Sequence, residues 1–384
     1  MLKMTRHRIL AFIALGCSLI CAFLLCGAAQ AQFAGRADRE PSAELRKIVP
    51  SVAAKYKIPG LAVALIENGR VRDTVTNGVR DKVSGAPIDR NTVFEAASLG
   101  KPVFAYGVLR TVAEGKLNLG APLTQYLPLP YLREADPFHP PKINSVDPIY
   151  EPAFNQITAF RVLNHTSGMP NWARNQHLML VFPPGEKWSY SSEGYIYLQR
   201  VIEHISDEPL QTFVLRTVLG PLGMPQSSFV WRPEYETRIA TGYDRLGTRV
   251  ASQPYTLPVA STTLYTTIDD YARFVTSVLA SAPRQRAHES AVSLMLNPTV
   301  AVDPALSFSW GLGWGLETFA GDLYFFHWGA NPGFQSFVMA SRKTGQGIVI
   351  LTNSENGLEA AREIVQATMG GTHRIFESRL LHPD

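Results

Sequence analysis

Residues 92–114 read TVFEAASLGKPVFAYGVLRTVAE, and the predicted fold depends on this stretch. Apolar residues recur at helical spacing after Ser98, so we predict a helix from about residue 98 to residue 114. Gly115 then follows, and glycine is typical of the position just past a helix end. Ser98 therefore stands at the start of an apolar helix.

Lys101 follows Ser98 by three positions and shares a face of the predicted helix with it. Unpaired backbone N–H groups at a helix start favour developing negative charge on a serine oxygen. A lysine one turn on can take the hydroxyl proton when burial or nearby charge lowers its pKa. We predict Ser98 as a nucleophile and Lys101 as its base, although the pair alone also fits an N-cap serine and a surface lysine.

A second segment that could take part in catalysis is Tyr190-Ser191-Ser192. A tyrosine hydroxyl can relay a proton between a nucleophile and a leaving group when nearby cations lower its pKa. On its own this segment is weak evidence for a catalytic role, because buried tyrosines with a hydrogen-bonded hydroxyl are common.

A third segment, from His327 to Ala330, ends an apolar strand-like run. Gly329 would let the backbone approach a substrate closely. The backbone N–H groups of Ala330 and Ser98 could together form an oxyanion hole. A lone histidine at a strand end more often has a structural role. This segment therefore indicates catalysis only together with the other two segments.

In this order, the three segments resemble the motifs of the serine β-lactamase and penicillin-binding-protein superfamily: Ser-x-x-Lys, a Tyr/Ser-x-Asn element and a Lys-Thr-Gly-like strand. The resemblance is greatest to the class C β-lactamases, the family VIII carboxylesterases, and the D-stereospecific aminopeptidases and carboxypeptidases. It covers most of the chain after the N-terminal segment. Further similar segments lie at 58–63, 163–170, 184–185, 311–314, 332–334 and 351–353.

The resemblance implies an α/β (α+β) fold, with a mainly antiparallel sheet built from both chain ends and flanked by helices, plus an all-helical part. We place the hydrolase domain at 32–384, its sheet part at about 41–97 and 263–384, and its helical part at about 98–262. The residue patterns themselves predict strands and helices within this plan. The strands are expected at 61–66, 71–79, 310–316, 323–327, 334–340 and 347–353, and two further helices at 268–275 and 358–369.

The resemblance also assigns roles to residues. Ser98 would attack the substrate, Lys101 and Tyr190 would share general base and acid duty in an order left open, and the N–H groups of Ser98 and Ala330 would hold the oxyanion. Four residues would contact the substrate: Ser192, His327, Trp328 and Gly329. The expected partner is a small ester, amide or D-amino-acid peptide.

Two departures from the β-lactamase pattern bear on the substrate. Ser192 stands where an asparagine is usual, and has a hydroxyl in place of a carboxamide. His327 stands where a lysine is usual, and its reference pKa near 6.5 leaves it mostly neutral at pH 7. We therefore expect a carboxylesterase or D-amino-acid peptidase ahead of a β-lactamase or D-Ala-D-Ala carboxypeptidase. One alternative function, from a different class, is a non-catalytic periplasmic protein that binds peptidoglycan. Another is an acyltransferase, which would pass the acyl group to an alcohol or amine.

The first 31 residues resemble an export signal, with a basic start, an apolar run from Ile9 to Leu25 and a small-residue site at Ala29-Gln30-Ala31. We expect cleavage after Ala31 and a periplasmic or secreted product, with an uncleaved membrane anchor as the alternative. Cys17, Cys21 and Cys26 all lie in this segment, so no disulfide, thiolate or cysteine metal site is expected beyond it.

Several function classes are not expected. The net charge is +4, of which Lys3, Arg6 and Arg8 supply three, so the remaining chain has no basic footprint for nucleic acid. The sequence has no Gly-x-Ser-x-Gly elbow, zinc-protease motif, phosphate loop or dinucleotide fingerprint. His165 and His177 are too scattered to indicate zinc. We expect no cofactor and no metal.

Overall fold

The computed structural model describes residues 43–133, 147–149, 152–173, 178–252, 254–280 and 286–381. The predicted signal segment, the three cysteines and His177 lie outside these ranges. None of the helices within them combines the length and apolar character needed to cross a membrane. Cleavage and export stay predictions.

β1 (Gly60–Glu67) shows why the main sheet lies between two layers. It is buried along almost its whole length. Successive side chains of a strand point to opposite faces. Val63 and Leu65 belong to one hydrophobic cluster, whereas Ala62 and Ala64 belong to another. A strand with two apolar faces has to be covered on both, so helices are required on each side of the sheet.

The predicted opening hairpin is confirmed. β1 pairs antiparallel with β2 (Arg70–Gly78), and the turn between them holds Asn68 and Gly69 at φ values of 52° and 67°. Asparagine and glycine are the residues that adopt this left-handed conformation most readily. The turn residues therefore favour the reversal of the chain into β2, and the register shifts between Leu65 and Ile66.

The main sheet has eight strands within the described residues, and each pair of neighbours is antiparallel. Across the sheet they are β2, β1, β12 (Gly347–Thr352), β11 (Phe334–Ser341), β10 (Asp322–Asn331), β9 (Gly315–Phe319), β8 (Phe308–Trp310) and β7 (Val300–Asp303). Both ends of the described chain thus contribute strands to one sheet. The predicted fold class is confirmed.

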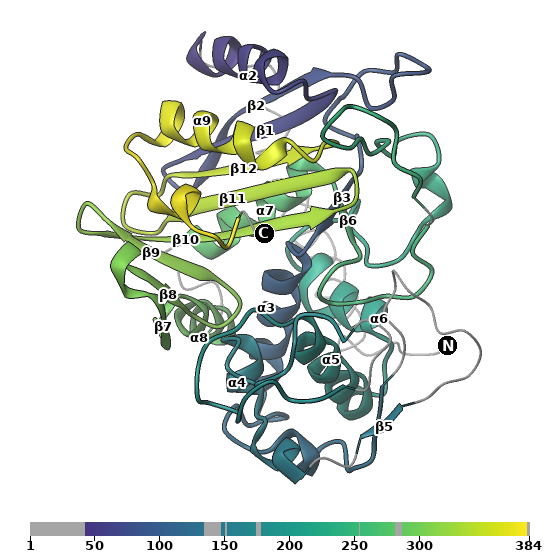
Figure 1. Cartoon of the computed structure of the whole chain (residues 1–384), viewed down its shortest axis with the longest axis vertical. Helices are drawn as coiled ribbons and strands as arrows, with labels where there is room; N and C mark the ends of the chain where they lie inside the picture. Colours follow the sequence, from purple (N-terminus) through teal and green to yellow (C-terminus); the bar gives the residue numbers. More distant parts are fainter. Residues whose placement is uncertain are drawn as a thin grey trace, which may run out of the picture. The chain divides into compact units, whose positions relative to one another are not determined.

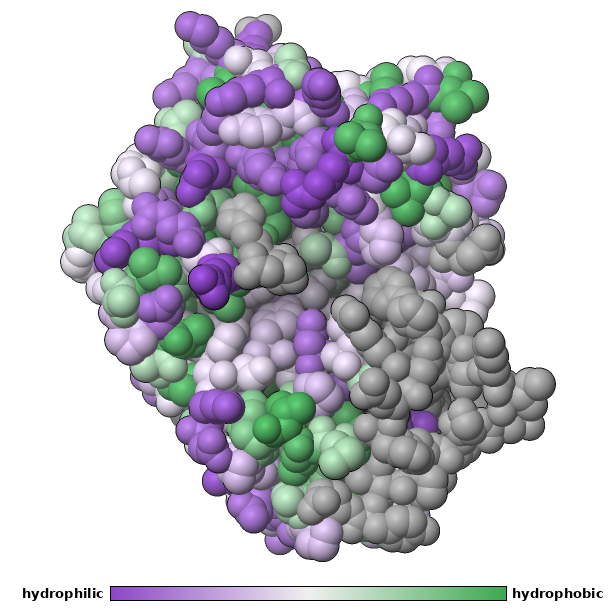
Figure 2. Space-filling model, in the orientation of Figure 1, coloured by the Kyte–Doolittle hydropathy of each residue, from purple (hydrophilic) through white to green (hydrophobic). Residues whose placement is uncertain are grey.

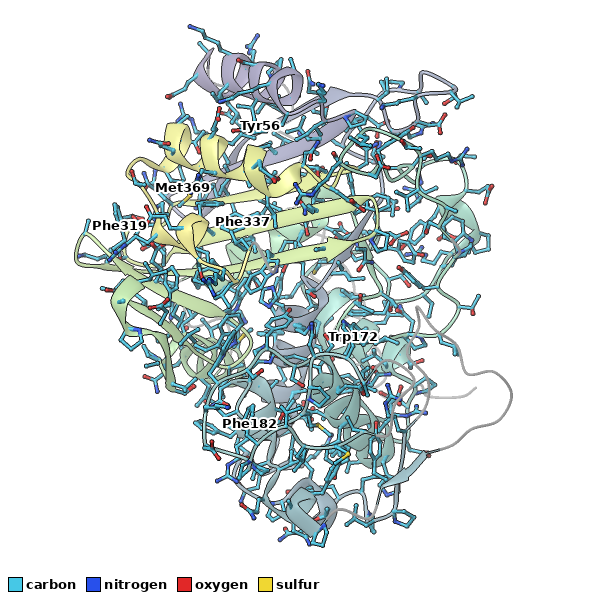
Figure 3. The ribbon with its side chains drawn as sticks, viewed as in Figure 1. Tyr56, Trp172, Phe182, Phe319, Phe337 and Met369 are labelled. Atoms are coloured by element: carbon cyan, nitrogen blue, oxygen red, sulfur yellow. The ribbon has the colours of Figure 1, made fainter. Side chains whose placement is uncertain are left out.

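Helices cover both faces of this sheet (Figure 1). α2 (Ala43–Lys55) and α9 (Gly357–Met369) lie on one face, where Phe337 and Met369 are seen in Figure 3, and α7 (Ile268–Leu279) lies on the other. The remaining helices are α3 (Gly100–Ala113), α4 (Ala159–Leu163), α5 (Ser192–Ser206), α6 (Leu210–Val214) and α8 (Arg286–Leu296). Shorter helical turns are η1 (Leu123–Gln125), η2 (Pro152–Gln156), η3 (Leu215–Leu219), η4 (Pro233–Tyr235), η5 (Pro304–Leu306) and η6 (Arg374–Glu377).

The residues predicted as one strand at 310–316 form two strands, so that prediction is wrong. The Gly311 N–H donates to the Trp314 carbonyl (2.9 Å), and Gly313 has a φ of 97°. A Cβ atom on Gly311 would lie 2.0 Å from the carbonyl oxygen of Met295. The apolar pattern continued through this turn because all its side chains are buried, which hid the reversal of direction.

The described residues also form two small sheets besides the main one. β3 (Phe94–Ala97) pairs with β6 (Leu264–Thr266), and β4 (Tyr131–Arg133) pairs with β5 (Asp147–Ile149). Most of the loop expected between residues 127 and 152 lies outside the described residues. α4, α5 and α6 fall within the part predicted to be helical, whose boundaries near residues 98 and 262 stay predictions.

Candidate active site

Ser98 lies in the turn that joins β3 to α3 and is half-buried. The residue before it, Ala97, has a φ of 51°, a left-handed conformation that is uncommon for alanine. The Leu99 N–H donates to the Ala96 carbonyl (3.1 Å), which closes this turn. No backbone carbonyl in the described residues accepts from the Ser98 N–H, so that group is available to an incoming oxygen.

Lys101, on the first turn of α3, is fully buried and points at the Ser98 side chain. Its Nζ donates to the Ser98 Oγ (3.1 Å), to the Ser192 Oγ (3.2 Å) and to the backbone carbonyl of Ser261 (2.9 Å). All three acceptors are neutral. Burial therefore lowers the pKa of Lys101 well below its ordinary value, because no carboxylate offsets the loss of water around the ammonium group.

Tyr190 precedes α5 and places its ring beside the lysine, whose Nζ lies 4.6 Å from the ring centre. Trp328 stacks on this ring with centroids 5.3 Å apart. Burial raises the pKa of the Tyr190 hydroxyl, and the Ser98 side chain acts in the opposite direction. The phenol is therefore protonated at neutral pH and can donate.

Ser192 opens α5, where Ser191 caps the helix by accepting from the Gly194 N–H. The Ser192 side chain is buried, and its Oγ accepts a hydrogen bond from Lys101. The structure thus brings Ser98, Lys101 and Ser192 into one hydrogen-bonded group. The predicted contact of Ser192 with substrate stays a prediction.

His327, near the end of β10, is buried and neutral. Its Nδ1 lies 2.8 Å from the Trp328 carbonyl. A carbonyl only accepts, so Nδ1 carries the hydrogen and Nε2 is left as an acceptor. Burial, with a contribution from the charge of Lys101, lowers the pKa of His327 to about 3. The His327 side chain therefore offers no positive charge to a substrate carboxylate, and direct contact between His327 and substrate stays a prediction.

Gly329 is required by the packing of β10 on β3. A Cβ atom at this position would lie 2.2 Å from the Ala96 carbonyl oxygen and 2.4 Å from the Ser336 Oγ. The Ala96 carbonyl, in the segment that carries Ser98, thus lies against Gly329, and close approach of a substrate to Gly329 stays a prediction. The missing side chain lets the two strands meet.

The exposed residue Ala330 follows on this strand. Asn331 pairs with Phe334 across a two-residue turn, and hydrogen-bonded and non-hydrogen-bonded pairs alternate along an antiparallel ladder. Ala330 therefore directs its N–H away from β11, towards the edge that meets β3. This geometry suits the oxyanion role predicted for Ala330 and Ser98, which stays a prediction.

Sequence reasoning missed a hydrogen-bond network centred on the buried Glu95, behind this strand. The carboxylate of Glu95 accepts from Ser252 (2.7 Å), Tyr255 (3.1 Å) and the Asn331 amide (3.1 Å), while Asn331 Oδ1 accepts from Thr262 (3.0 Å). Burial raises the pKa of Glu95, and these hydrogen bonds oppose the increase. The network ties β3, β10 and the segment that supplies the Ser261 carbonyl into one unit.

Its members are far apart in the chain, so spacing gave no signal for them. Ser261 contributes its backbone carbonyl, and the identity of a side chain does not indicate what its main chain contacts. In the described residues no group of three or more His, Cys, Asp or Glu side chains could hold a metal ion.

Both the sequence and the fold are similar to those of known proteins. The family model described as Beta-lactamase matches residues 45–368. Protein Rv1367c of Mycobacterium tuberculosis is 32% identical over 236 residues, which cover 53% of this chain and 57% of that protein. Esterase EstB of Burkholderia gladioli is 27% identical over 218 residues, 49% of this chain and 52% of the esterase. The matches thus span about half the length of these relatives.

The fold is also that of a solved structure, the D-alanine carboxypeptidase AmpC from Burkholderia cenocepacia. The two share 18% sequence identity with a TM-score of 0.72, over 85% of this chain and 97% of that one. At this identity the likeness concerns the fold.

Proposed function

This chain belongs to the beta-lactamase family, whose members are generally serine hydrolases, and we propose that it hydrolyses esters or amides that carry no carboxylate, through an acyl-enzyme on Ser98. Carboxylic esters and D-amino-acid amides are the preferred substrates, ahead of β-lactams. One observation carries this proposal: the buried Lys101 Nζ, with neutral acceptors only, lies 3.1 Å from the Ser98 Oγ.

The lowered pKa of Lys101 supplies the base for acylation. Neutral Lys101 takes the Ser98 proton as the Oγ attacks the substrate carbonyl, and the N–H groups of Ser98 and Ala330 hold the oxyanion. Tyr190 gives its proton to the leaving oxygen or nitrogen as the bond to carbon breaks. Lys101 then returns the first proton to Tyr190, which leaves an acyl ester on Ser98 and a free alcohol or amine.

Deacylation repeats these transfers with water as the nucleophile. Lys101 takes a proton from the attacking water, and the Ser98 Oγ recovers it when the acid leaves. The assignment of Lys101 as base and Tyr190 as acid rests on the opposite pKa shifts of the two groups, lowered for the lysine and raised for the tyrosine.

The substrate preference rests on the side chains opposite the nucleophile. His327 is neutral, so a β-lactam carboxylate has no cation at the position where β-lactamases have lysine. Trp328 presents a partly exposed indole next to it. A neutral, apolar group fits this wall better than a carboxylate. The similarity to an esterase supports the same preference.

Export to the periplasm or the medium is part of the proposal. N-terminal sequencing of the mature protein tests it, with Gln32 as the expected first residue. A product that begins at Met1 in the membrane fraction would contradict it.

The test of the proposed function is Ser98→Ala, measured on a panel of short-chain esters, D-amino-acid amides and nitrocefin. We expect loss of ester or amide turnover by about 10⁴-fold or more, since a nucleophile is removed. A fluorophosphonate should add mass to the wild type and not to Ser98→Ala.

Full ester turnover by Ser98→Ala would contradict the proposal. Muropeptide binding by the wild type, without any acylation over hours, would favour the non-catalytic alternative. Nitrocefin turnover faster than ester turnover would overturn the substrate preference.

A further inference from the structure

His165 contacts the main chain on both sides of Tyr190. Its carbonyl accepts from the Ser189 N–H (2.9 Å), and its Nδ1 accepts from the Ser191 N–H (3.1 Å). The imidazole also lies against the Tyr190 ring, with centroids 4.5 Å apart and planes inclined by 33°. One residue thus holds both neighbours of the tyrosine and the tyrosine ring itself.

These bonds fix the ionisation state of the imidazole. A backbone N–H only donates, so Nδ1 must be unprotonated and Nε2 must carry the hydrogen. His165 is fully buried, and burial, with smaller contributions from Lys101 and His327, lowers its pKa well below the ordinary value. Neutral His165 remains an acceptor for Ser191 over the working pH range.

His165 is itself held in an unusual conformation. Its φ is 61°, in the left-handed region, directly after α4. Its N–H donates to the Val162 carbonyl (3.0 Å), and the next N–H, of Thr166, donates to the Arg161 carbonyl (2.8 Å). The end of α4 therefore determines where the imidazole lies.

The Tyr190 hydroxyl forms no hydrogen bond of full geometry among the described residues, although the Ser98 side chain is near enough to lower its pKa. Its position therefore depends largely on the Tyr190 backbone and on the rings around it, which include those of His165 and Trp328. We propose that His165 is a positioning residue that aims the Tyr190 hydroxyl at the leaving group, through its two main-chain bonds and its ring contact. The proposal rests on the proposed function, in which Tyr190 is the proton donor.

Two substitutions at His165 separate this role from general support of the fold. Asparagine tolerates the left-handed conformation, and its Oδ1 replaces Nδ1 as the acceptor for Ser191. Phenylalanine keeps a ring but leaves the Ser191 N–H unpaired. We expect kcat/KM of His165→Asn to stay within about tenfold of the wild type, and that of His165→Phe to fall about a hundredfold, since small misplacements of a catalytic group have effects of this size.

The readout is the ratio of kcat/KM for ethyl butyrate to that for p-nitrophenyl butyrate, measured in a pH-stat. A p-nitrophenolate leaves without a proton, whereas ethoxide needs one. His165→Phe and Tyr190→Phe should both lower this ratio by about tenfold or more, the size of a proton-donor effect. A loss of folded protein alone would lower both rates equally and leave the ratio unchanged.

A double-mutant cycle completes the test. If His165 acts through Tyr190, then His165→Phe should change the ratio by less than about twofold in the Tyr190→Phe background. If His165→Phe does not fold, His165→Ala takes its place in the same cycle. Additive effects of the two substitutions, or an unchanged ratio in His165→Phe, would overturn the inference about His165 without affecting the Ser98→Ala result. Full activity of Ser98→Ala would instead contradict the proposed function.

Discussion

Lys101 and Arg133 are two buried cations that contact consecutive residues at the start of α5, and they are held in opposite ways. Lys101 donates only to neutral oxygens, including the Ser192 Oγ (3.2 Å). Arg133 forms two hydrogen bonds to the carboxylate of Glu193, at 2.6 and 3.1 Å. The side chains of Arg133 and Glu193 are only 9% and 1% exposed.

The difference separates a reactive group from a structural one. A buried ion pair with good geometry is electrically satisfied and keeps its charge. A buried lysine without a counter-charge is pushed towards its neutral form, which is the form that can accept a proton. The Glu193 carboxylate also accepts from the Ala173 N–H (2.9 Å), so the pair anchors the chain before α5, next to the catalytic group.

The largest expected effect comes from removing the unpaired cation. Lys101→Met should lower kcat/KM for a short-chain ester about a thousandfold or more, because the base is lost. Its melting temperature should change by only a few degrees, since methionine restores apolar volume where a charge lacked a partner. Lys47→Met, at an exposed lysine of α2, is the control and should leave both values unchanged. A Lys101→Met protein that keeps its activity would contradict the role of Lys101 as the base.

Breaking the paired cation should instead affect stability. Glu193→Gln removes the carboxylate charge that accepts two hydrogen bonds from the buried Arg133, and we expect the free energy of unfolding to fall by about 3 kcal/mol. Urea denaturation followed by circular dichroism measures this change. Glu234→Gln, at an exposed carboxylate paired with Arg232, is the matched control and should cost under 1 kcal/mol. A loss from Glu193→Gln no larger than the control would contradict the structural role of the pair.

The smallest effect is a difference in pH dependence. The pKa of Lys101 is lowered in the folded protein, so the unfolded chain binds one more proton between that pKa and 10.5. Lys101 thus makes the free energy of unfolding rise with pH in this window, by at most about 1.4 kcal/mol per pH unit. This contribution is complete above 10.5 and is lost as pH falls through the folded pKa.

The measurement is urea denaturation between pH 7 and 9 of the wild type and Lys101→Met. The wild type should show the steeper rise, and the Lys47→Met control should match the wild type. Equal slopes for wild type and Lys101→Met would mean that the folded lysine keeps an ordinary pKa.

Surface features are less informative than these buried groups. Phe160, Met179 and Val181 are among the exposed hydrophobic residues, and Figure 2 shows hydrophobic surface in the region of α4, to which Phe160 belongs. Trp172 and Phe182, seen in Figure 3, come from the same stretch of chain.

Local patterns in the sequence were sufficient for much of the fold. The hairpin of β1 and β2, the helix after Ser98 and the strands near the C-terminal end follow from apolar periodicity and turn residues, which act over a few positions. The prediction of a single strand at 310–316 was wrong, because every side chain in the turn is buried and the apolar pattern shows no break there. α8 and β7 were not predicted either.

The sequence by itself determined the order of the motifs, the position of Ser98 before an apolar helix, and Lys101 one turn later. Only the tertiary structure decided that Lys101 has neutral partners, that Gly329 is needed by the Ala96 carbonyl, and that His165 holds the chain around Tyr190. The physical reason is that these contacts use main-chain atoms or join residues far apart in the chain. A main-chain carbonyl is the same at every position, so only folding makes one of them the partner of a catalytic lysine.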